Sequence, residues 1–123
     1  MPVVYYAASY PAARKSGRRI RVLIAIAPKM YGQVLAHSIA INRPGLEMLR
    51  LEPAELDGQL VGFDPQLVFR NEATDRIRAH AASWVVLTCP AGDKMDASAC
   101  LWGHRQAGAD VGMADMLALV DAA

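Results

Sequence analysis

The residues of this chain best suited to covalent chemistry are a cysteine and a histidine in its second half. Cys89 directly follows the apolar segment 84–88, and His104 follows the next predicted strand. A cysteine becomes a nucleophile when a neighbouring base or a helix N-terminus stabilises its thiolate. Pro90 follows Cys89 and favours a turn over a helix start. The pair Cys89 and His104 is therefore a candidate for catalysis, but the pattern favours a non-catalytic protein.

Nucleotide and metal sites would require other residue types beside the first apolar segment. A phosphate-binding loop needs glycines so that the backbone can approach the phosphate closely, and the nearest one, Gly32, lies inside a predicted helix. Metal ions need clustered carboxylates or imidazoles, whereas the segment ends in Ile26 and Ala27. We therefore expect neither a cofactor nor a bound metal.

The elements that position these residues start with the segment 20–27, which is apolar at nearly every position. Such a run predicts a strand buried on both faces, as in the middle of a parallel sheet. Pro28 suits the start of a helix over 29–42, since the missing N–H costs nothing there. Its predicted inward face is Tyr31, Val34, Leu35, Ser38 and Ile41, with Ile39 beside them. Further strands are predicted at 46–51, 66–70, 84–88 and 96–102, with helices after residue 52 (Leu56, Leu60 and Val61 inward), at 75–82 and at 113–120, and a loop at 103–112.

This alternation of strands and helices predicts an α/β fold. We expect a three-layer, doubly wound, parallel five-stranded sheet of the flavodoxin or receiver type, with strand order 2-1-3-4-5. Ligands bind such sheets beyond the carboxyl ends of the strands. The candidate ligand or interaction site at this edge is Pro28, Asn71, Thr88, Cys89 and His104.

Charge divides the chain into two parts. Residues 1–19 hold four basic and no acidic side chains, whereas residues 20–123 hold nine basic and twelve acidic ones. We expect a flexible basic extension over 1–19 and one domain over 20–123. Nucleic-acid binding through four basic charges on a tail would be weak and salt-sensitive, so a nucleic-acid partner is not expected.

The remaining composition predicts a cytoplasmic protein. No apolar run reaches the roughly eighteen residues that a membrane span requires, so we expect no membrane partner. The two cysteines form neither a disulfide framework nor a zinc motif, and we expect both to be reduced thiols.

Two stretches carry a family resemblance. The segment 22–48 resembles the first strand, first helix and following turn of response-regulator receiver domains, and the segment 64–71 resembles their third strand. Thr88 matches the switch Ser/Thr of that family. Receivers hold magnesium with two acids where this chain has Ile26 and Ala27, and they phosphorylate an aspartate where it has Asn71. The resemblance implies a degenerate receiver-like domain that is not phosphorylated.

The leading functional hypothesis is a non-catalytic regulatory or protein-interaction module. Its partner would be another protein or a second copy, docking on the last helix and the segment 100–102. The alternative is a small-molecule binder or small enzyme in which Asn71, Thr88, Cys89 and His104 meet around one pocket.

Overall fold

The computed structural model describes residues 20–88 and 94–123. This part of the chain holds six strands: β1 (Arg21–Ala25), β2 (Glu47–Arg50), β3 (Leu67–Arg70), β4 (Ser83–Thr88), β5 (Asp96–Leu101) and β6 (His104–Gly108). Its helices are α3 (Lys29–Asn42), the 3-10 turn η1 (Pro53–Glu55), α4 (Leu56–Phe63), α5 (Asp75–His80) and α6 (Met113–Ala122). The predicted extension 1–19 lies outside the described residues.

The strands form one mixed sheet in the order β2-β1-β3-β4-β5-β6. The first four strands of that order are parallel, whereas β5 and β6 each run antiparallel to the preceding strand. The predicted five-stranded, all-parallel, flavodoxin-like sheet is therefore wrong. Residues 89–95 between β4 and β5 are too few for a crossover helix, which takes about ten residues or more, so β5 has to return antiparallel.

A tight hairpin joins β5 to β6, and it corrects the predicted loop over 103–112. Trp102 and Gly103 both have positive φ, 54° and 85°, and they connect the paired residues Leu101 and His104. Two consecutive positive φ values give a two-residue hairpin turn whose twist matches the strands it joins. The strand β6 itself has weak strand propensity, so its pairing with β5, and not its own pattern, fixes its conformation.

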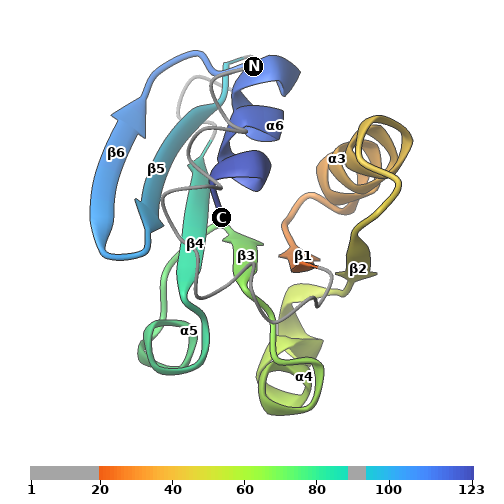
Figure 1. Cartoon of the computed structure of the whole chain (residues 1–123), viewed down its shortest axis with the longest axis vertical. Helices are drawn as coiled ribbons and strands as arrows, with labels where there is room; N and C mark the ends of the chain where they lie inside the picture. Colours follow the sequence, from red (N-terminus) through yellow and green to blue (C-terminus); the bar gives the residue numbers. More distant parts are fainter. Residues whose placement is uncertain (1–19, 89–93) are drawn as a thin grey trace.

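Two helical layers cover the sheet, with α3 and α6 on one face and α4 and α5 on the other (Figure 1). Val22 and Ile24 of β1 belong to the first apolar cluster, and Leu23 and Ala25 belong to the second. All four side chains are fully buried. The prediction of a first strand that is central and buried on both faces is confirmed, because β1 lies between β2 and β3.

Helix α3 spans the predicted residues, and its buried face overlaps the predicted one but is rotated away from Val34 and Ile41. Its buried residues are Gly32, Leu35 and Ile39, whereas Val34 and Ile41 are 55% and 64% exposed. A Cβ atom at position 32 would lie 3.4 Å from the backbone oxygen of Ile26, so Gly32 lets the helix rest closely on the end of β1. That close approach turns Val34 and Ile41 away from the core.

Helix α4 shows a second difference of this kind. Leu56 and Leu60 are buried as predicted, but Val61 is 63% exposed. A helix on a sheet buries one stripe of residues, and on α4 that stripe passes through Leu56 and Leu60, four positions apart.

An ion pair links the last turn of α6 to the C-terminal end of α3. The guanidinium of Arg43 donates to both carboxylate oxygens of Asp121, from Nε and from a terminal nitrogen, each at 2.6 Å. This hydrogen bonding to Asp121 raises the pKa of Arg43 above its ordinary value, while burial acts in the opposite direction. The two helices are thus joined at the ends that lie far from their first turns.

Candidate functional site

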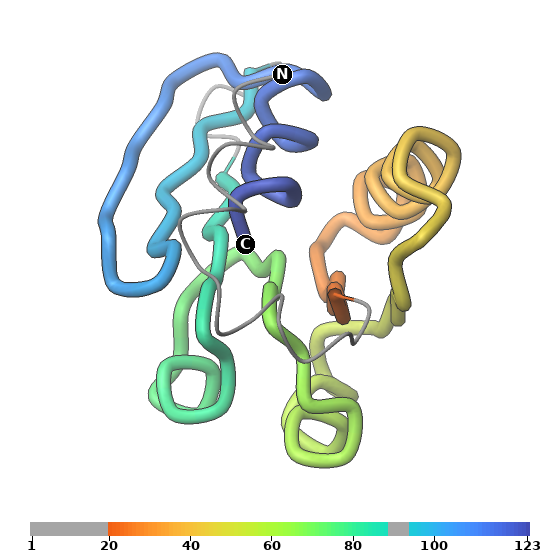
Figure 2. Tube along the Cα trace, in the orientation of Figure 1, coloured from red at the N-terminus to blue at the C-terminus, as the bar shows by residue number. Residues whose placement is uncertain are grey.

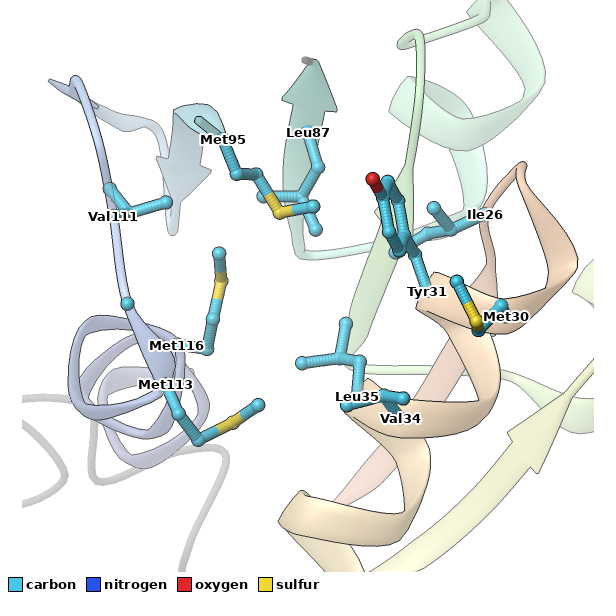
Figure 3. Close-up of a pocket in the computed structure, with 11 residues that line it drawn as sticks. Ile26, Met30, Tyr31, Val34, Leu35, Leu87, Met95, Val111, Met113 and Met116 are labelled. Atoms are coloured by element: carbon cyan, nitrogen blue, oxygen red, sulfur yellow. The ribbon is translucent and has the colours of Figure 1, made fainter. Parts of the chain in front are cut away.

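An apolar groove opens between the first halves of α3 and α6, at the carboxyl edge of the parallel strands (Figure 3). Its volume is about 330 Å³. The groove is lined by Ile26, Met30, Tyr31, Val34, Leu35, Leu87, Met95, Val111, Gly112, Met113 and Met116. Of these side chains only Tyr31 carries a hydroxyl or charged group. The lining therefore selects apolar groups by shape and burial, and not by charge.

Four of the six methionines in the chain line this groove. They come from the first turn of α3 (Met30), the start of β5 (Met95) and the first two turns of α6 (Met113 and Met116). Met116 is buried, whereas Met30 is 63% exposed. Methionine side chains are flexible and polarizable and adapt to differently shaped apolar surfaces. The groove thus combines a buried floor with an adaptable rim.

Asn71 fastens the strand ends beside the floor of the groove. Its side-chain oxygen accepts a hydrogen bond of 2.7 Å from the backbone N–H of Ala27. Its amide nitrogen donates to the carbonyl oxygens of Ala27 at 3.0 Å and Leu87 at 3.2 Å. Ala27 follows the lining residue Ile26, and Leu87 is itself a lining residue, so Asn71 ties together two sides of the groove floor. All three contacts use the side chain to position backbone.

Pro28 and Thr88 lie at this same edge, and both are exposed. Pro28 follows Ala27 and precedes α3, and Thr88 is the last residue of β4. Cys89 lies outside the described residues. The structure thus brings Pro28, Asn71 and Thr88 to one edge, as the rule for parallel strands predicts.

His104 lies at the other end of the strands, where the parallel strands begin. It pairs with Leu101, which pairs with Ser83 at the start of β4. Ser83 and Thr88 are five residues apart along the strand, a distance of about 16 Å at the usual rise per residue. The pocket in which Asn71, Thr88 and His104 were to converge is therefore not formed, because the antiparallel return of β5 carries His104 away.

The described residues also limit two other classes of site. In residues 20–88 and 94–123, no three His, Cys, Asp or Glu side chains gather as a metal site would require. The same residues contain no helix with the length and apolar character needed to cross a membrane.

Comparison of the chain with protein-family models, with curated proteins and with solved structures finds no match. The receiver resemblance consequently rests on the sequence pattern of residues 22–48 and 64–71 alone.

Sequence reasoning missed the groove because it placed Val34 on the inward face of its helix and did not bring the starts of the two helices together. The signal that was available is the spacing of the methionines. Met30 falls in the first turn of one predicted helix, and Met113 and Met116 fall in the first two turns of another. Helices that start at the same edge of a sheet bring such residues together.

Proposed function

We propose that this chain is a non-catalytic protein-interaction module, and that its groove between α3 and α6 receives the apolar side chains of a partner's amphipathic helix. The observation that carries the proposal is the methionine-rich lining, which holds almost no polar group and opens at the ligand-binding edge of the sheet. Recognition of an amphipathic helix in an apolar groove uses anchors spaced by three or four residues.

The outward side of α3 favours a helical partner over a small molecule. Met30, Val34 and Ile41 are all more than half exposed, and they lie on one stripe of α3 that also holds the exposed His37 between Val34 and Ile41. The fourteen residues of α3 extend about 21 Å. A partner helix of about four turns would cover this surface, whereas a small ligand would fill the groove and leave the exposed stripe uncovered.

The absence of catalysis is part of the proposal and is supported by the positions of the candidate residues. Both ends of the Asn71 amide are engaged by backbone groups, and His104 lies at the other end of the strands. We also propose a cytoplasmic location, which the free thiol of Cys100 supports, because unpaired thiols are usual in a reducing compartment.

A charge placed on the rim of the groove tests the proposal. The probe is a fluorescein-labelled 14-residue peptide of leucine and glutamine with leucines at helical spacing, titrated with the protein and followed by fluorescence anisotropy. Met30→Glu should weaken binding at least tenfold, because the carboxylate would lose water against apolar side chains.

The matched control is Val61→Glu on α4. Val61 is 63% exposed, as Met30 is, but it lies on the opposite face of the sheet. The control should bind the peptide as the unmodified protein does. Equal weakening by both variants, or no binding by the unmodified protein, would contradict the proposal. Backbone amide shifts that are confined to α3 and α6 on titration would support it.

A further inference from the structure

The strand β6 forms one border of the sheet, outside β5 (Figures 1 and 2). All five of its residues are exposed. Within residues 20–88 and 94–123 it pairs with β5 alone. In the described part of the chain, the outer side of β6 therefore presents backbone groups to solvent.

The hairpin geometry shows which backbone groups point outward. In a two-residue hairpin the residues that close the turn, here Leu101 and His104, form a hydrogen-bonded pair, and bonded and non-bonded pairs then alternate. Arg105 faces Cys100 and Ala107 faces Ser98 in the non-bonded pairs. The N–H and C=O groups of Arg105 and Ala107 consequently point away from β5 and are placed to pair with another strand.

The two borders of the sheet differ in their protection against such pairing. On β2, Glu47 forms an ion pair of 3.1 Å with Arg21, and Pro53 follows shortly after the strand. Charged side chains and prolines are the usual means of blocking an edge strand. The sequence of β6, His-Arg-Gln-Ala-Gly, contains no proline, and Arg105 is its one permanently charged side chain. A proline therefore does not block the outward backbone groups of β6, and a further strand would have to place an opposite charge beside Arg105.

Charge along β6 selects the direction of that further strand. His104 and Arg105 begin the strand, and two acids lie just beyond its other end, where the backbone N–H of Asp110 donates to the carboxylate of Asp96 at 3.1 Å. An antiparallel copy of the same strand would set each basic end beside the acidic end of the other. A parallel copy would set like charges together.

We propose that β6 pairs antiparallel with β6 of a second copy of this chain, so that one continuous sheet crosses a twofold dimer. In such a pair the Ala107 backbone groups of the two copies bond reciprocally at the twofold axis, as an isologous interface requires, and Arg105 lies opposite position 109 of the other copy, next to its Asp110. The hollow of about 220 Å³ between α6 and the β5–β6 hairpin lies directly beside this border, and Gln106 and Leu119 line it. It leaves room for side chains of the second copy. This surface is separate from the groove proposed above.

A charge exchange tests the pairing. Sedimentation equilibrium of the full chain should show a dimer that dissociates on dilution. Arg105→Glu alone and Asp110→Lys alone should each weaken the dimer at least tenfold, because each sets like charges together at both ends of the interface. An equimolar mixture of the two variants should recover dimers, since the mixed pair restores two attractive contacts.

A second variant tests the backbone directly. Ala107→Pro removes an outward N–H that the β5–β6 pairing does not use, and it should also weaken the dimer at least tenfold. The control is Val61→Glu, at an exposed position of α4, which should leave the dimer unchanged. A monomer at every concentration would overturn the proposal. So would a dimer that survives Arg105→Glu, Ala107→Pro and Asp110→Lys alike, or a mixture of the charge variants that fails to associate.

Discussion

The substitution Asn71→Asp examines the structural role of Asn71 most directly. The new side chain keeps an oxygen that accepts from the Ala27 N–H, but it loses the amide donor to the carbonyls of Ala27 and Leu87. At neutral pH it also places a negative oxygen about where that donor was, roughly 3 Å from two carbonyl oxygens.

The expected loss follows from these contacts. Each lost hydrogen bond is worth about 1 kcal/mol, and repulsion between the carboxylate and the two carbonyls adds to this. Asn71 is partly exposed, so water compensates part of the loss. We expect the free energy of unfolding to fall by about 2 to 3 kcal/mol at neutral pH. The loss should be smaller near pH 4, where protonation restores one O–H donor.

Urea unfolding followed by far-UV circular dichroism measures this change. Gln59→Glu is the matched control, since it makes the same amide-to-carboxylate change at an exposed position of α4. The control should change the free energy of unfolding by less than about 0.5 kcal/mol. An Asn71→Asp variant as stable as this control would refute the positioning role of Asn71.

Three further predictions concern the ion pair, a buried cation and phosphorylation. Asp121→Asn should cost about 1 to 2 kcal/mol in urea unfolding. The folded state raises the pKa of Arg43, so the resulting stabilisation is complete below the pKa of this residue in the unfolded chain and is lost only above it. The cost of Asp121→Asn should therefore be constant from about pH 6 to 10. A steep decline of that cost within this range would contradict the role of the Arg43–Asp121 pair. Arg70 is buried, donates to the Ala25 carbonyl at 3.3 Å and forms an ion pair of 3.7 Å with the exposed Glu72, while its Nε has no hydrogen-bond partner among the described residues. Arg70→Met should therefore leave thermal stability equal or higher, and a lower melting temperature would count against this. Incubation with acetyl phosphate and Mg²⁺ should leave the intact mass unchanged, and a phosphoryl adduct in the mass spectrum would refute the inferred loss of receiver chemistry.

Local patterns in the sequence predict much of the first half of the fold. The apolar run 20–27 and the helix signals from Pro28 to Pro44 are each contained in one stretch of chain, so β1 and α3 are found where they are predicted. The direction of β5 depends instead on the length of the connection that precedes it. The facing of α3 depends on the contact between Gly32 and Ile26, which no helical periodicity contains.

The candidate site likewise has one part that the sequence predicts and one part that it does not. The rule for parallel strands brings Pro28, Asn71 and Thr88 to one edge because each follows or ends a parallel strand. The groove requires α6 to return to the same face as α3 after the β5–β6 hairpin, and it therefore depends on residues far apart in the chain. His104 was misplaced for the same reason, since its location follows from the reversal at β5.

The contact between Arg43 and Asp121 also determines how the groove can change its width. This contact holds the C-terminal ends of α3 and α6 together. We therefore expect the groove to widen by a rotation of the two helices about this contact. Met30 and Met113, which begin the two helices, travel furthest in such a rotation, while side chains nearer the pivot scarcely move. For the partner helix proposed above, we therefore expect the inner end of the groove to discriminate between side chains more strictly than its entrance does.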